Sequence, residues 1–65
     1  MQWSDLSAFL SVTQHGSFSR AATALHISQP AVTKRVQNLE NELEVRLFDR
    51  IGRSIHLTDA GKLLK

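Results

Sequence analysis

The stretch Ser28-Gln29-Pro30-Ala31-Val32 carries the start signal of a helix. The hydroxyl group of Ser28 can cap the helix, and Pro30 would lie in the first turn, where its missing N–H is not needed. Four apolar residues at spacings of four, three and four are expected to form the buried side of this helix: Val32, Val36, Leu39 and Leu43. The longest helix of the chain is therefore expected from Ser28 to about Glu44.

Two further helices are predicted upstream. Apolar residues recur at three- and four-residue steps over residues 3–13, and they predict a helix from about Ser4 to His15 that stops at Gly16. Ser17 can then cap a short helix over residues 18–25, whose alanines favour helix formation. Because only a short turn separates this second helix from the third, the pair is expected to form a helix-turn-helix.

The pattern changes after Val45 to two short runs of β-compatible residues. Residues 47–50 and 54–57 flank the connection Ile51-Gly52-Arg53, which has the length and the glycine of a turn. They predict a small hairpin, which would be the wing of a winged helix-turn-helix.

The sequence after the hairpin has the start signal of a fourth helix. Thr58 can cap it and Asp59 lies in its first turn, while Leu63 and Leu64 are expected to be unshielded. The expected fold is therefore mainly α, with three helices, a β-hairpin wing and the start of a fourth helix.

Length and composition exclude several classes of function. Sixty-five residues bury a thin core with little room for a catalytic cleft, so no enzyme is expected. The chain has no cysteine, which excludes disulfides and thiolate metal sites, and a reducing cytoplasm is the expected compartment. Its apolar runs are far shorter than the ~20 residues of a membrane-spanning helix, so no membrane partner is expected. The net charge of +2 permits a polyanionic partner.

The third helix would expose a polar face opposite its apolar side. At about 100° per residue, the members of this face are Pro30, Lys34, Gln37 and Asn41, with Ala31, Thr33 and Asn38 at the margins. Lysine reaches guanine acceptors or phosphate, carboxamides pair with adenine, and alanine and proline can contact a thymine methyl group. Since any solvated helix face is polar, the neighbouring elements have to decide between DNA binding and an ordinary surface.

Basic residues near the third helix favour DNA. Arg50 and Arg53 belong to the hairpin, where a wing would meet the DNA backbone or minor groove. Ser17 and the N-terminal amides of the second helix can hold a phosphate, although Ser17 can equally be a structural cap. Arg20 either contacts a phosphate or covers the helix surface.

Other assignments fit less well. The histidines lie in separate elements without metal-ligand spacing, so no metal, cofactor or catalytic site is expected at His15, His26 and His56. The aromatic residues can in principle stack on unpaired bases, but they fall on predicted buried stripes or element junctions and are expected in the core: Trp3, Phe9, Phe18 and Phe48.

Two points concern partners other than DNA. The acidic residues at the end of the third helix, Glu40, Glu42 and Glu44, are expected to be solvated, and to face away from DNA or toward a partner. A winged-helix module used for protein association is the alternative function, because the fold alone does not fix the partner.

Several tracts in one order give the chain a family resemblance. They are Gly16-Ser17-Phe18-Ser19-Arg20-Ala21-Ala22, Leu25-His26-Ile27-Ser28-Gln29-Pro30-Ala31-Val32-Thr33, Leu39-Glu40, Leu47-Phe48-Asp49-Arg50 and Leu57-Thr58-Asp59-Ala60-Gly61. Together they resemble the N-terminal winged helix-turn-helix domain of LysR-type transcriptional regulators over essentially the whole chain.

The resemblance implies sequence-specific binding of double-stranded DNA, with the helix that starts at Ser28 in the major groove. Family members commonly carry arginine where Lys34 stands and a basic residue where Gln37 stands, which implies fewer charged contacts here. The residues expected to bind DNA are Ser17, Phe18, Arg20, Ser28, Gln29, Pro30, Ala31, Thr33, Lys34, Gln37, Asn38, Arg50 and Arg53.

The resemblance also implies parts beyond Lys65. Family members continue through a linker helix, which mediates dimerisation, into a C-terminal domain that binds a small-molecule effector. Residues 1–57 are then the DNA-binding domain, and residues 58–65 are the truncated start of the linker helix. The full-length protein is expected to be a cytoplasmic, nucleoid-associated bacterial homodimer that reads two half-sites.

Overall fold

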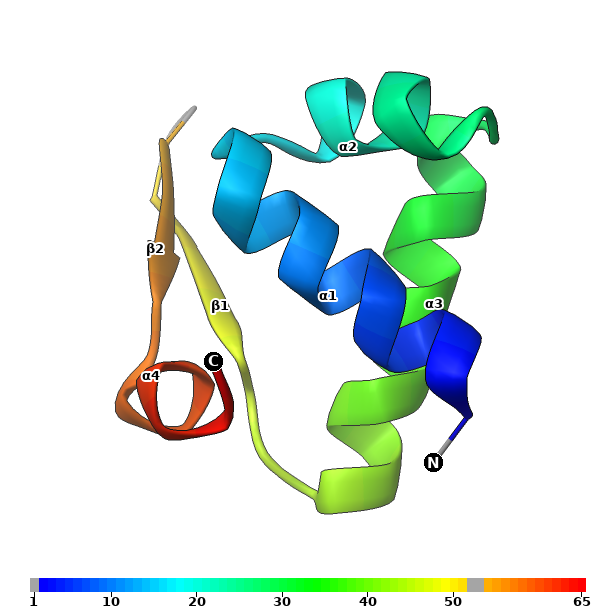
Figure 1. The fold of residues 1–65 in the computed structure, drawn as a ribbon. Coiled ribbons are helices and arrows are strands. Elements are labelled where there is room, and N and C mark those ends of the chain that lie inside the picture. The colour runs from blue at the N-terminus through cyan, green and yellow to red at the C-terminus, as the bar shows by residue number, and fades with distance from the viewer. Residues whose placement is uncertain (1, 52–53) are drawn as a thin grey trace.

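The computed structural model describes residues 2–51 and 54–65. The elements in these ranges are α1 (Trp3–His15), α2 (Phe18–Leu25), α3 (Gln29–Leu43), β1 (Phe48–Ile51), β2 (Ser54–Leu57) and α4 (Asp59–Leu64). α1 packs against both α2 and α3, and the two-stranded hairpin stands beside these three helices (Figure 1). The winged helix-turn-helix expected from the sequence is therefore confirmed.

The predicted helix boundaries are also confirmed by local hydrogen bonding. Gly16 ends α1 in the left-handed conformation, with a φ of 72°. The Oγ atom of Ser17 accepts the N–H of Arg20 at 2.9 Å at the start of α2. The Oγ atom of Ser28 accepts the N–H of Ala31 at 3.2 Å at the start of α3. Capping chemistry that is readable from the sequence therefore sets the helix-turn-helix.

Two helices end at residues other than glycine in the left-handed conformation. His26 follows α2 with a φ of 58°, and Glu44 follows α3 with a φ of 57°. The N–H of each residue bonds back to a carbonyl group in the last turn of its helix. This conformation costs a residue that carries a Cβ atom about 1 kcal/mol, so both helix ends are held at some expense of stability.

The core lies between α1, α2, α3 and the base of the hairpin. From α3, Val32, Val36 and Leu39 are buried in it as expected. The expectation for Leu43 is wrong, because its side chain is 37% exposed. Leu43 is the last residue of α3, where this helix extends beyond α1 (Figure 1).

α1 contributes a buried side that begins later than expected. Trp3 is 74% exposed, so its predicted place in the core is wrong. It is the first residue of the helix, and the buried residues of α1 are Asp5, Ala8, Phe9, Ser11 and Val12. The other three aromatic residues are buried as expected.

Phe48 attaches the hairpin to the helices. Its ring lies 5.3 Å from the ring of Phe9 and 5.7 Å from that of Phe18, centroid to centroid, and the second pair meets edge to face. The two strands pair antiparallel, with Phe48 opposite Leu57. Aromatic packing therefore fixes the hairpin at its base.

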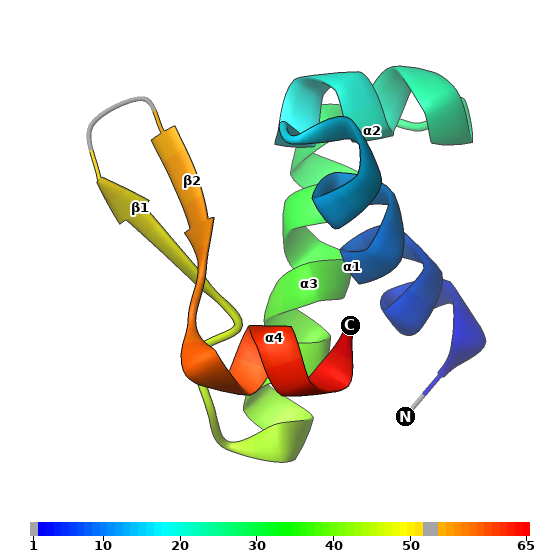
Figure 2. The same ribbon diagram turned by 60° about the vertical axis from the view of Figure 1, so that its left-hand side comes forward.

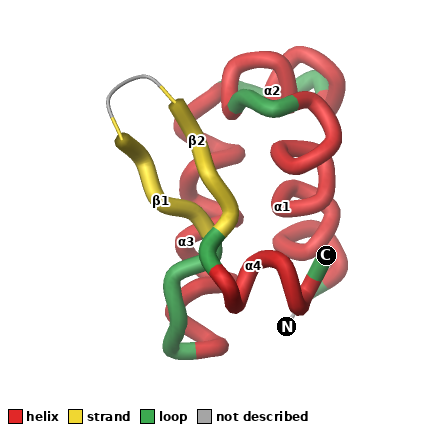
Figure 3. Tube along the Cα trace, turned by 90° about the vertical axis from the view of Figure 1, so that its left-hand side faces the viewer, coloured by secondary structure: helices red, strands yellow, loops and turns green. Residues whose placement is uncertain are grey.

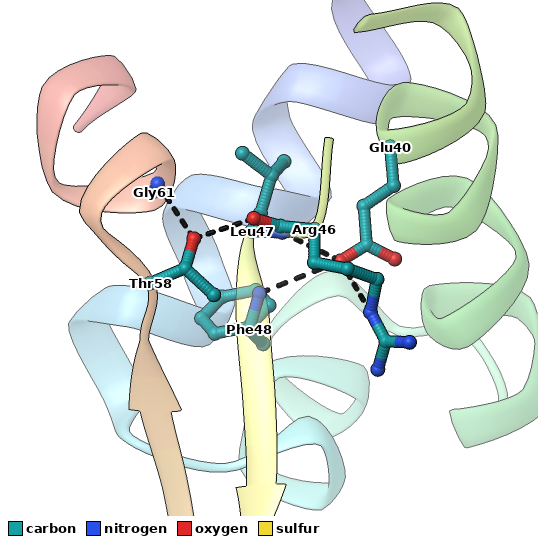
Figure 4. A network of polar contacts seen from close by, with 6 residues as sticks. All are labelled: Glu40, Arg46, Leu47, Phe48, Thr58 and Gly61. Carbon is teal, nitrogen blue, oxygen red and sulfur yellow. Dashed lines mark hydrogen bonds and ion pairs between the residues drawn. The ribbon is translucent and has the colours of Figure 1, made fainter. Parts of the chain in front are cut away.

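Polar contacts join the same base to α4. Thr58 caps α4 by accepting the N–H of Gly61 at 3.1 Å, and its hydroxyl group donates to the carbonyl oxygen of Arg46 (Figure 4). The N–H of Thr58 donates to the carbonyl oxygen of Leu47 at 3.0 Å. Leu47 was expected inside the first strand, but it lies just before β1 because its backbone bonds to other elements.

The two leucines at the end of α4 differ from each other. Leu63 is 87% exposed, as expected. Leu64 is partly buried and packs against the core, so the expectation that both are unshielded is wrong for Leu64. One side of α4 therefore packs against the core and the other side faces solvent.

Candidate nucleic-acid interface

Three elements that the sequence predicted near DNA lie at one end of the molecule. In the upper part of Figures 1 and 2 lie α2, the first turns of α3 and the far ends of the two hairpin strands. α4 and the last turn of α3 lie at the opposite end, and Figure 3 shows the same division. We call the first of these regions the α2 end.

The exposed face of α3 begins at the α2 end. A shallow hollow of about 470 Å³ lies over this face and is lined by Gln29, Pro30, Thr33, Lys34 and Gln37. Asn38 is exposed beside it, whereas Ala31 is half-buried. The face therefore offers solvent an ammonium group, carboxamides and small apolar groups, which are the groups that recognise base edges in a major groove.

The side chains at the start of α2 differ in their exposure and in the contacts that they already make. Ser17 is half-buried and its hydroxyl oxygen is engaged as the helix cap. Phe18 is 5% exposed and packs on Phe48, so only its backbone is placed to take part in a contact with DNA. Arg20 is exposed. A cation and a helix N-terminus therefore lie at the same end as the polar face of α3.

Of the two predicted hairpin arginines, the structure describes the backbone position of Arg50. Arg50 lies in β1 opposite Ile55, one residue before the strand reaches its end at Ile51. Arg53 lies outside the described residues. The end of β1 that follows position 50 lies at the α2 end (Figure 2).

Glu40 was expected to be solvated, and this expectation is wrong. Its side chain is 15% exposed, and its Oε2 atom accepts the N–H of Leu47 at 2.8 Å and that of Phe48 at 3.4 Å (Figure 4). The Nε atom of Arg46 lies 4.0 Å from the same oxygen. The residues that bond to Glu40 lie beyond a loop, so helix periodicity does not reveal them. Glu42 and Glu44 are exposed as expected.

Metal-ligand clusters and membrane-spanning helices are two other features that would bear on function. Residues 2–51 and 54–65 contain no group of three histidine, cysteine, aspartate or glutamate side chains that could hold a metal ion. Within the same ranges, none of the helices has the length and apolar character needed to cross a membrane.

Comparison with known sequences gives a consistent result. Residues 3–62 match a family model described as "Bacterial regulatory helix-turn-helix protein, lysR family". Over 64 residues the chain is 53% identical to an uncharacterized HTH-type transcriptional regulator in the ibpB-leuC intergenic region of Azotobacter vinelandii. The match covers 98% of this chain and 44% of that protein, so the chain spans less than half the length of this relative.

Two solved structures of DNA complexes are similar to this fold. One is the complex of BenM_DBD with catB site 1 DNA, with a TM-score of 0.93 and 36% identity, covering 98% of this chain and 71% of that chain. The other is the CbnR_DBD-DNA complex, with a TM-score of 0.91 and 41% identity, covering 97% and 72%. The likeness extends to both backbone and sequence.

Proposed function

We propose, from the premise that this chain belongs to the lysR family of bacterial regulatory helix-turn-helix proteins, that it binds double-stranded DNA in a sequence-specific manner. The observation that carries the proposal is the α2 end, where the exposed polar face of α3 lies with the start of α2 and the far ends of the hairpin strands. Two proteins of similar sequence and fold are described in complex with DNA, which supports it.

In this proposal the first half of α3 enters the major groove. Lys34 contacts guanine acceptors or a phosphate, and the carboxamides of Gln29 and Gln37 pair with base edges. Pro30 and Ala31 contact thymine methyl groups. Ser28, Thr33 and Asn38 lie at the margins of this face, next to the DNA backbone.

The remaining contacts position the domain on the duplex. Ser17, the backbone of Phe18 and the side chain of Arg20 contact phosphates at the start of α2. Arg50 and Arg53 contact the backbone or the minor groove from the hairpin.

The distribution of charge along α3 supports this orientation. Lys34 lies in the half of α3 near the α2 end, and the exposed Glu42 lies in the last turn at the opposite end. Glu44 is exposed just beyond that turn. Acidic side chains at this end of α3 repel the phosphate backbone, so the favourable approach presents the first half of α3 to DNA.

The proposal extends to the protein of which this domain is a part. Residues 1–57 are the DNA-binding domain and residues 58–65 begin a linker helix, through which two copies dimerise on an operator with two half-sites. The regulator works in the cytoplasm on the bacterial nucleoid, and a small-molecule effector acts through a C-terminal domain.

Fluorescence anisotropy of a labelled AT-rich duplex tests the proposal at about 50 and 200 mM salt. We expect duplex binding that weakens steeply with salt and that single-stranded DNA does not displace. A folded chain that binds neither the duplex nor heparin, also when the linker helix is restored, would favour a protein-association module instead.

A further inference from the structure

Glu40 makes the direct polar link between α3 and the base of the hairpin. Its Oε2 atom accepts two backbone N–H groups, from Leu47 just before β1 and from Phe48 at its first residue. Figure 4 shows the carboxylate directed at the point where the loop becomes the strand. The Glu40 side chain therefore links α3, which would contact bases, by hydrogen bonds to the start of β1, which carries Arg50.

The peptide that Glu40 holds is fixed from its other side as well. The carbonyl oxygen of Leu47 accepts the N–H of Thr58, and the side chain of Leu47 is fully buried. A buried N–H group that loses its acceptor costs free energy. If the Glu40 carboxylate moves, the backbone of Leu47 and Phe48 is therefore expected to move with it.

The base of the hairpin borders an open space beside α3. A hollow of about 440 Å³ lies there, and its lining residues are Phe18, Val36, Gln37, Glu40, Asn41, Arg46 and Phe48, of which Phe48 belongs to the hairpin. At a strand rise of about 3.3 Å per residue, Ile51 lies about 10 Å from Phe48. A tilt of about 15° at the base would move the end of β1 by about 3 Å, which exceeds the tolerance of a hydrogen bond.

We propose that Glu40 is a positioning residue for DNA binding, which holds the hairpin at the angle to α3 that lets both elements engage one duplex. The inference rests on the proposed function, because it needs the hairpin to contact DNA. Glu40 itself lies toward the opposite end of α3 from the α2 end and acts through the N–H groups of Leu47 and Phe48.

Two conservative substitutions separate the reach of the side chain from its charge. Glu40→Gln keeps a carbonyl oxygen at the same distance from the backbone but removes the negative charge. Glu40→Asp keeps the charge but is shorter by one methylene group, so its oxygens fall short of Leu47. If Glu40 acted only by repelling phosphate, Glu40→Gln would tighten binding and Glu40→Asp would leave it unchanged.

The test measures duplex affinity by anisotropy at about 50 and 200 mM salt for the parent chain and both variants. Glu42→Gln and Glu42→Asp are matched controls, because Glu42 is an exposed glutamate on the same helix. Amide hydrogen exchange of Leu47 and Phe48, followed by NMR, reports on the hairpin base, and that of Val32 and Val36 reports on the core.

We expect Glu40→Gln to bind as tightly as the parent chain, and Glu40→Asp to bind about three- to tenfold more weakly, with a shallower salt dependence. In Glu40→Asp the amides of Leu47 and Phe48 should exchange faster while those of Val32 and Val36 stay protected. The Glu42 variants should show neither change.

Parent-like binding by Glu40→Asp would overturn the inference. Should Glu40→Asp lose protection throughout α3, Glu40→Gln decides: parent-like binding supports the role of Glu40. Tighter binding, which repulsion alone predicts, or binding weakened by about threefold or more contradicts it. Absence of duplex binding by the parent chain would instead refute the proposed function.

Discussion

The carboxylate of Glu40 accepts the backbone N–H of Leu47 at 2.8 Å, which bonds the last turns of α3 to the residue before β1. On the other side of Leu47, its carbonyl oxygen accepts the N–H of Thr58 at the start of α4. The helix, the hairpin and the C-terminal helix therefore meet at one backbone segment. This junction lies away from the α2 end, so we infer that it acts on DNA binding through the angle at which it holds the hairpin.

Replacement of Gly61 by alanine should destabilise the domain by about 1–3 kcal/mol, because a Cβ atom there would clash with the carbonyl group of Leu47. Helix propensity alone predicts the opposite sign, since alanine stabilises a helix relative to glycine. Urea unfolding followed by circular dichroism measures the change. Lys62→Ala, one residue further at an exposed position, should stay within about 0.5 kcal/mol of the parent chain. A Gly61→Ala variant as stable as the parent would show that α4 does not pack closely on Leu47.

Replacement of Glu44 by glycine should raise the free energy of unfolding by about 0.5–1 kcal/mol, because glycine adopts the left-handed conformation of this residue without strain. The same substitution two residues earlier, Glu42→Gly, lies within α3 and should lower it by about 0.5–1 kcal/mol. Thermal and urea unfolding of the two variants give the signs. Equal effects at both positions would contradict the assigned end of α3.

Leu39→Ala should lower the free energy of unfolding by about 2–5 kcal/mol, because Leu39 is fully buried on the core side of α3. Leu43→Ala should cost clearly less, since its side chain is more than one third exposed at the end of the helix. The difference between the two variants in urea unfolding tests the rotation of α3. A larger loss for Leu43→Ala would mean that the helix is turned relative to the structure.

Lys34→Ala should weaken binding to a duplex without a large change in stability. If Lys34 contacts a phosphate, affinity should fall for all sequences and the salt slope should decrease by about 1. If it contacts a base, the loss should be about 1–3 kcal/mol and confined to particular sequences. Lys62→Ala removes the same group from α4 at the opposite end and should leave affinity nearly unchanged. Comparable losses for both lysines would argue against docking through the α2 end.

The helix-turn-helix could be predicted from the sequence because its signals are local. Ser17 and Ser28 bond to N–H groups three residues later, and the period of Val32, Val36 and Leu39 marks one side of a single helix. The exposed polar face of α3 that starts at Gln29 could be predicted for the same reason, since it follows from the period of this one helix.

The features that the sequence did not predict are of two kinds. One is a contact between residues on either side of a loop, and the other is the exposure of apolar residues at the ends of helices. Glu40 bonds to residues beyond a loop, and their position follows from how the hairpin packs. Trp3 and Leu43 continue the apolar pattern of their helices, but each lies at a helix end beyond the packed core. Periodicity shows which side of a helix is apolar, but it does not show where the neighbouring helix stops covering it.

Docking through the α2 end is tested most directly by NMR titration of the chain with duplex DNA, following the backbone amides. We predict that the largest shifts fall on residues 17–20, on residues 29–37 and on the strand ends at Ile51 and Ser54, while Trp3 and the residues of α4 change little. Shifts concentrated in α4 and the last turn of α3, with residues 29–37 unchanged, would contradict the proposed interface.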